Sequence, residues 1–191
     1  MLTGVFMMII RKYESKDFDD VRYTCLNSDE LADEGNLAEF VLHTFCDYYL
    51  EREPENCFVL DDDGRAVGYI ICAENYDRYK DIFDKDYLPL NKNLGDDLYK
   101  WACESTVLQN KYKTDYPAHL HIDLLPPYQR QGWGGKLLEA LFAHLKSKGI
   151  KGVMLTAGTE NIKGGSFYKK YGFEILEVLG TDVAYGMKLN K

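Results

Sequence analysis

A turn rich in glycine, with glutamine and basic side chains, joins an apolar strand to an amphipathic helix at residues 129–136. Pro126 and Pro127 end the strand, because proline cannot donate a ladder hydrogen bond. The first N–H groups of the following helix lack intrahelical acceptors, and the helix dipole adds a partial positive charge. The turn therefore predicts a phosphate site, with a purely structural tight turn as the alternative. Its residues are Gln129, Arg130, Gln131, Gly132, Trp133, Gly134, Gly135 and Lys136.

Polar side chains also alternate along the strand that precedes this turn. His119, His121 and Asp123 occupy every second position, so their side chains point to one face of the strand. A carboxylate there can accept a proton from a reacting amine, directly or through a water. We therefore predict Asp123 as the general base. The alternative is that Asp123 only orients a neighbour such as His121.

The turn matches neither the Gly-x-x-x-x-Gly-Lys-Ser/Thr motif nor the dinucleotide motif Gly-x-Gly-x-x-Gly. It resembles the Gln/Arg-x-x-Gly-x-Gly/Ala motif of the GNAT superfamily of N-acetyltransferases, here residues 129–134. A second block, Asn161, Tyr168 and Gly172-Phe173, matches the pattern that the family carries further along the chain. The two blocks cover about residues 118–177. Within the superfamily, residues 120–123 and 167–175 most resemble the acetyltransferase-like domain found with O-linked N-acetylglucosamine hydrolases.

The resemblance implies an acetyl-CoA site and places its parts. The pyrophosphate would bind the backbone amides of residues 131–136. The pantetheine arm would lie between two splayed strands, about 119–125 and 152–157, against the backbone of Leu124 and Leu125. Asn161 would bond the cofactor or hold the turn. Tyr168 would lie near the sulfur, where a tyrosine with a pKa of about 10 can donate a proton to the leaving thiolate.

The implied reaction is direct attack by a primary amine on the thioester within a ternary complex. The acceptor is either a small-molecule amine or a peptide amine. The chain is either a monomer or a homodimer, and the sequence leaves both open. The alternative function is an acyl-CoA-binding module without catalysis. A metal site is the weaker alternative: residues 119–123 resemble part of the His-x-His-x-Asp-His motif of metallo-β-lactamase-like hydrolases, but Leu124 stands where the last histidine belongs. We therefore expect no metal.

Composition narrows the class of protein. The chain has 191 residues, 46% of them apolar, and a formal net charge of −8, which argues against nucleic acid as a partner. No apolar run is long enough to cross a membrane. The first ten residues are apolar but lack a basic leader, so we do not expect a signal peptide. The cysteines form no Cys-x-x-Cys pair, so we expect a cytoplasmic protein with reduced thiols. Translation starts at Met1, Met7 or Met8, and the sequence does not distinguish them.

The elements that position these residues alternate between strands and helices. We expect strands at 8–13, 57–60, 66–73, 119–125, 152–157, 173–179 and 183–189, and helices at 17–27, 36–51, 136–148 and 162–171. Residues 74–117, the aromatic and acidic segment, predict two further helices, 76–84 and 94–110, split at Pro89. The resemblance implies one α/β domain over 1–191, with a mixed, mostly antiparallel sheet, helices on both faces and the 74–117 segment as an insert. Its aromatics either fill core or line the acceptor pocket.

Overall fold

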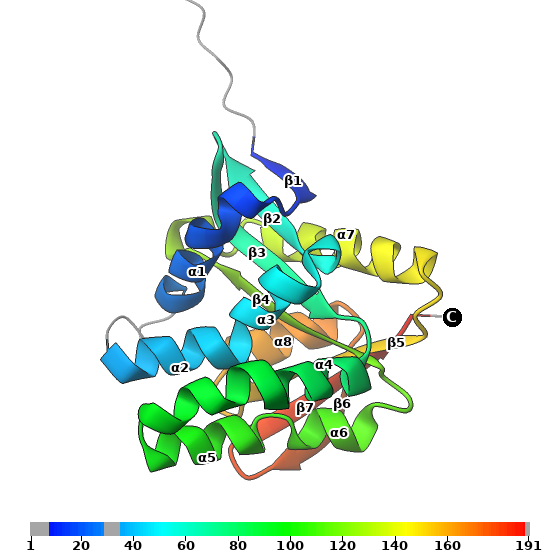
Figure 1. The fold of residues 1–191 in the computed structure, drawn as a ribbon. Coiled ribbons are helices and arrows are strands. Elements are labelled where there is room, and N and C mark those ends of the chain that lie inside the picture. The colour runs from blue at the N-terminus through cyan, green and yellow to red at the C-terminus, as the bar shows by residue number, and fades with distance from the viewer. Residues whose placement is uncertain (1–7, 29–34, 190–191) are drawn as a thin grey trace, which may run out of the picture.

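A seven-stranded sheet forms the centre of the molecule in the computed structural model, which describes residues 8–28 and 35–189 (Figure 1). The alternative start residues Met1 and Met7 lie outside these ranges. The sheet order is β1-β2-β3-β4-β5-β7-β6. The strands are β1 Ile9–Lys12, β2 Phe58–Asp62, β3 Arg65–Ala73, β4 Ala118–Leu124, β5 Gly152–Gly158, β6 Glu174–Leu179 and β7 Asp182–Lys188.

The contact between β4 and β5 differs from every other strand pairing in this sheet. It is parallel and joins only two residue pairs, Ala118 with Val153 and His119 with Met154. The other neighbouring strands pair antiparallel over longer stretches. Because β4 and β5 each continue for several residues beyond this contact, they diverge toward their carboxyl ends. The predicted mixed sheet with splayed fourth and fifth strands is confirmed.

Helices pack against both faces of the sheet and enclose two large apolar cores, and a smaller cluster forms around Leu108, Met154 and Ala184. On one face, α1, α2, α3 and α4 bury side chains against Tyr69 and Ile71 of β3. On the other, α7 and α8 pack against Ile70, Cys72 and Leu120. The helices are α1 Phe18–Asn27, α2 Gly35–Phe45, α3 Asp47–Arg52, α4 Tyr76–Ile82, α5 Asp96–Glu104, α6 Val107–Tyr112, α7 Trp133–Ser147 and α8 Ile162–Lys170. Among the described residues, none of the helices is long and apolar enough to cross a membrane.

The expected helix at 36–51 is two helices, α2 and α3, separated at Cys46. Cys46 has φ −130° and ψ −63°, which is not helical backbone. The change of direction lets α3 bury two consecutive tyrosines, Tyr48 and Tyr49, in the core. The 3.6-residue pattern did not reveal this break, because both halves are apolar on the buried side.

The 74–117 segment is helical, as predicted, but its breaks lie elsewhere. The chain continues from α4 through a π-helical turn at Phe83–Tyr87 into a 3₁₀-helix at Leu88–Asn93, with Pro89 in the first turn of the latter. Proline fits there because a first-turn residue needs no N–H acceptor. The expected helix at 94–110 is broken between α5 and α6, where the Ser105 hydroxyl donates to the Ala102 carbonyl at 2.8 Å.

Candidate active site

The turn between β4 and α7 has the geometry of an anion-binding helix start. A short 3₁₀-helix, Pro126–Tyr128, follows β4, and α7 begins at Trp133. Gly132 has φ 88°, a left-handed conformation that favours glycine. The helical hydrogen bonds begin with Lys136, whose N–H donates to the Gly132 carbonyl at 3.3 Å. The backbone N–H of Lys136 is therefore already hydrogen-bonded. Only the exposed side chain of Lys136 is available to a ligand.

Helix packing favours glycine at two positions of the turn, which the sequence did not suggest. A Cβ on Gly135 would lie 1.8 Å from the Tyr171 hydroxyl oxygen, and one on Gly134 would lie 3.0 Å from the Phe167 ring. Both aromatic residues belong to α8 or to the turn at its end. The start of α7 therefore needs small residues so that α8 can pack against it, besides any need for a close approach by a ligand.

The glutamine side chains of the turn hold the turn itself. The Gln129 amide nitrogen donates to the carbonyls of Ser28 at 3.0 Å and Leu124 at 2.9 Å, which joins the end of α1 to the end of β4. The Gln131 amide nitrogen donates to the Pro127 carbonyl at 2.6 Å. The positive charges at the turn come from Arg130 and Lys136, both exposed. The Lys136 ammonium lies 3.9 Å from the centre of the Trp133 ring.

The divergence of β4 and β5 opens a cavity of about 160 Å³ between them. It brings together three residues that the sequence analysis selected from separate motifs: Asp123, Asn161 and Tyr168. β4 also presents backbone groups to this gap. Hydrogen bonds along an antiparallel strand alternate between its two sides. Since the Leu125 N–H donates to Val67 at 3.0 Å on the β3 side, the N–H groups of Leu124 and Ile122 face β5.

Leu125 is therefore not placed as the sequence analysis expected. Its N–H is bonded to the Val67 carbonyl, and its own carbonyl accepts from the Tyr128 N–H at 2.9 Å. Of the two leucines, only Leu124 directs its N–H toward the gap. The alternation of N–H groups along the strand follows from the sequence, but which of them face β3 depends on the register of the β3–β4 pairing.

Tyr168 lies in the wall of the gap with its ring in the core. Its side chain is 8% exposed and packs edge-on against the rings of Phe167 and Phe173. Burial, and to a smaller degree the charge of Asp123, raise the pKa of the Tyr168 hydroxyl above its usual value. The hydroxyl therefore stays protonated at neutral pH and can act as a proton donor.

Asn161 caps α8. Its side-chain oxygen accepts from the Gly164 N–H at 2.8 Å, which satisfies one of the free amides of the helix start. Of the two roles left open for Asn161, the structure shows the one that holds the turn.

The β4 side chains that were expected on one face do share it, but their surroundings differ. The Asp123 carboxylate accepts a hydrogen bond from the Tyr69 hydroxyl at 2.6 Å, and the His121 Nε2 lies 3.1 Å from the Tyr49 hydroxyl oxygen. Burial lowers the pKa of His121 to about 4, so its ring is neutral at pH 7. His119 is 2% exposed and lies in the aromatic core, with its ring 4.4 Å from that of Tyr79. Among the described residues, no group of three His, Cys, Asp or Glu is arranged to hold a metal ion.

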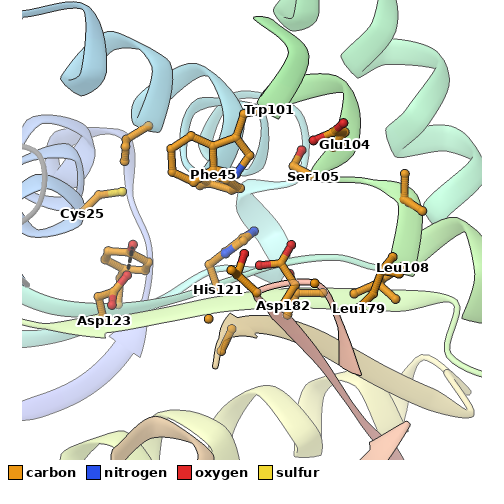
Figure 2. Close-up of a pocket in the computed structure, with 18 residues that line it drawn as sticks. Cys25, Phe45, Trp101, Glu104, Ser105, Leu108, His121, Asp123, Leu179 and Asp182 are labelled. Carbon is orange, nitrogen blue, oxygen red and sulfur yellow. Dashed lines mark hydrogen bonds between the residues drawn. The ribbon is translucent and has the colours of Figure 1, made fainter. Parts of the chain in front are cut away.

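A larger cavity of about 640 Å³ lies above this face, between the sheet and the helices that cover it (Figure 2). His121, Asp123 and Thr156 line its floor, and the 74–117 segment contributes much of its roof. Of the aromatic residues of that segment, Trp101 lines the cavity, whereas Tyr76, Tyr79, Phe83 and Tyr87 are core. The sequence did not indicate Tyr69 and Asp182 as lining residues, because Tyr69 has the pattern of a core strand residue and Asp182 that of a turn residue.

Comparison with known proteins finds relatives of this chain. A family model described as the acetyltransferase (GNAT) family matches residues 20–173. The crystal structure of a protein called SsHAT is 26% identical, with a TM-score of 0.84 over 96% of this chain and 99% of that one.

Two more distant structures show the same fold. The PaiA N-acetyltransferase of Thermoplasma acidophilum, solved in complex with coenzyme A, is 18% identical, with a TM-score of 0.62 over 95% of this chain and 99% of that one. A polyamine N-acetyltransferase of Drosophila melanogaster is 13% identical, with a TM-score of 0.66 over 95% of this chain and all of that one (100%).

Proposed function

The chain belongs to the acetyltransferase (GNAT) family, and we propose that it transfers an acetyl group from acetyl-CoA to the primary amine of a cationic acceptor by direct attack in a ternary complex. One observation carries this proposal. The cavity between β4 and β5 is lined by both Asp123, a candidate proton acceptor, and Tyr168, a candidate proton donor. A group that takes a proton from the amine and a group that gives one to the leaving sulfur each accelerate direct acyl transfer.

The residues around the gap and the turn fit coenzyme A. The start of α7 offers the first-turn amides of Trp133, Gly134 and Gly135 to a pyrophosphate, with the exposed Arg130 and Lys136 side chains beside them. The gap between β4 and β5 leads from this turn toward Tyr168 and can hold the pantetheine arm. The Thermoplasma PaiA enzyme, which has this fold, was solved with coenzyme A, which supports the same ligand here.

When bound, acetyl-CoA supplies the activated acetyl group, and the chain supplies the proton transfers. Asp123, held by Tyr69, accepts the proton that the amine loses as it attacks. The Leu124 N–H, which faces the gap, donates to the oxygen that becomes negative. Tyr168 donates its proton to the sulfur as the bond between carbon and sulfur breaks. The neutral ring of His121 adds no positive charge that would repel a cationic acceptor.

Two features support a cationic amine as the acceptor. The chain carries a net charge of −8, and carboxylates line the large cavity at Glu104, Asp123 and Asp182. Such a field raises the local concentration of cations. The Drosophila neighbour is named for polyamines, which are small amines of this kind.

Within the family, we propose a relation to the acetyltransferase-like domain found with O-linked N-acetylglucosamine hydrolases. The support comes from the segments 120–123 and 167–175. They bring Asp123 on β4 and Tyr168 on α8 to the same cavity.

A panel of amines mixed with acetyl-CoA tests the proposal through the release of free CoA. We expect at least one cationic amine to be acetylated, and Asp123→Asn to slow the reaction about 100-fold while leaving the calorimetric affinity for CoA unchanged. Asp81→Asn, an exposed change on α4, is the control. Tight CoA binding with no transfer to any amine would instead establish a binding module. A fully active Asp123→Asn protein would show that another group is the base.

A further inference from the structure

Two carboxylates face each other across the large cavity, apart from Asp123. Glu104 extends from the end of α5 in the helical roof, and Asp182 from the start of β7 in the sheet. Figure 2 shows both side chains directed into the cavity, with His121 between Asp182 and Asp123. The cavity thus has a negative group on its helical roof and another on its sheet side, besides Asp123, which also lines the gap between β4 and β5.

The pair of Glu104 and Asp182 has little compensation from the protein itself. Asp182 is exposed, and its partial desolvation, together with the charge of Glu104, raises its pKa, so the two carboxylates sense each other. The ammonium of Lys100 is 3.9 Å from Glu104, in an exposed pair of the kind that contributes little. In the parts of the chain that the structure describes, no cationic side chain pairs with Asp182. A cation bound between the two carboxylates would relieve their repulsion.

The size and lining of the cavity suit an extended, flexible chain. At about 640 Å³ the cavity is in the range that holds drug-sized ligands, much larger than a small monoamine. Trp101, which shares a face of α5 with Glu104, is 47% exposed, and with Phe45 it forms an apolar wall along the cavity. Methylene groups can lie against these rings, and a cation can lie over a ring face.

We propose that Glu104 and Asp182 form a second cation site in the acceptor cavity, so that the preferred acceptor is a primary amine with a second cationic group at the other end of a flexible apolar chain. This inference rests on the proposed function, since it assigns the reacting amine to Asp123. Glu104 and Asp182 then determine specificity and take no part in the chemical step.

The test compares amines that differ only in the second charge. Putrescine, cadaverine and hexamethylenediamine are assayed beside butylamine, pentylamine and hexylamine of the same chain lengths. We expect lower KM values for the diamines. Glu104→Gln and Asp182→Asn should each raise the diamine KM about 2- to 10-fold with kcat unchanged, in line with single exposed ion pairs. The KM of the monoamines should not change. Added salt should raise the diamine KM more than the monoamine KM.

A matched control is Asp97→Asn, which removes the same charge from α5 at an exposed position that does not line the cavity. Equal KM values for diamines and monoamines, or a diamine KM that neither substitution changes, would overturn the second cation site. If no amine of either series is acetylated, the proposed function itself fails, and the two failures are thereby distinguished. Unchanged CoA affinity in each variant shows that the protein is folded.

Discussion

Tyr168 combines a buried ring with a hydroxyl that stays protonated well above neutral pH. Replacement by phenylalanine keeps the ring in its aromatic surroundings and removes only the proton donor. We predict that Tyr168→Phe lowers kcat about 100-fold, a typical general-acid effect, with little change in the KM for acetyl-CoA. Steady-state kinetics with both substrates varied measures this.

The control for this substitution is Tyr23→Phe on α1. Tyr23 is half exposed and lies far in the sequence from the residues that line the gap between β4 and β5. It should leave both constants unchanged. If Tyr168→Phe turned over as fast as the unchanged protein, the proton for the leaving sulfur would have to come from another group or from water.

At the scale of elements, the start of α7 carries the prediction about coenzyme A. Lys136 lies in the first helical turn and is exposed, so a charge change there does not disturb packing. A glutamate at this position is favourable to the helix dipole but repels a pyrophosphate. We predict that Lys136→Glu stays folded and binds CoA about 10-fold more weakly, as expected when a charge contact is reversed. Isothermal titration calorimetry measures the affinity.

Lys146→Glu, at the opposite end of the same helix, is the matched control and should keep the original affinity. A folded Lys136→Glu protein with unchanged affinity would place the phosphate elsewhere. Charge reversal at Lys136 is a cleaner test than a substitution of Gly134, because a Cβ at Gly134 already meets the Phe167 ring at 3.0 Å.

The sequence predicts the strand, turn and helix that carry the site better than it predicts the helical segment 74–117 that covers the cavity. The strand β4, the glycine turn and α7 could be located because their signals are local: strand alternation, two prolines and a helical apolar face. The mixed, mostly antiparallel sheet with splayed fourth and fifth strands came from the resemblance and is confirmed. Local signals also predicted that Asp123 and its neighbours share a face.

What could not be predicted depends on contacts between segments distant in the chain. Tyr69 holds Asp123 across 54 positions, and Gln129 reaches Ser28 across 101. The packing of Tyr171 over Gly135 and the meeting of Glu104 with Asp182 are of the same kind. Each requires the register and helix placement of the finished fold. Within the 74–117 segment, the sequence could not separate core tyrosines from Trp101, because both follow the same helical spacing.

At the scale of the whole molecule, the buried histidine His119 makes the fold sensitive to acid. Its two ring nitrogens have no hydrogen-bond partner among the described residues, and burial lowers its pKa to about 3. The unfolded chain, with a histidine pKa of about 6.5, binds more protons in the interval between these values. The free energy of unfolding therefore decreases as pH falls from about 6.5 toward 3.

We predict that His119 alone costs about 2 kcal/mol of stability between pH 7.5 and pH 5. Urea denaturation at the two pH values measures the change, and His119→Leu should reduce it by about that amount. The comparison is made between the two proteins because Asp47 and Glu53, whose pKa values are raised by burial, act in the opposite sense. An equal pH dependence in both proteins would mean that His119 has the same pKa in the folded and unfolded states.

The central claim is that the amine attacks directly, with acetyl-CoA and acceptor held together where the large cavity meets the gap between β4 and β5. Initial rates measured over a grid of both substrate concentrations test this most directly. The account predicts double-reciprocal lines that intersect, and no acetylated protein by mass spectrometry after incubation with acetyl-CoA alone. Parallel lines together with a covalently acetylated chain would contradict it.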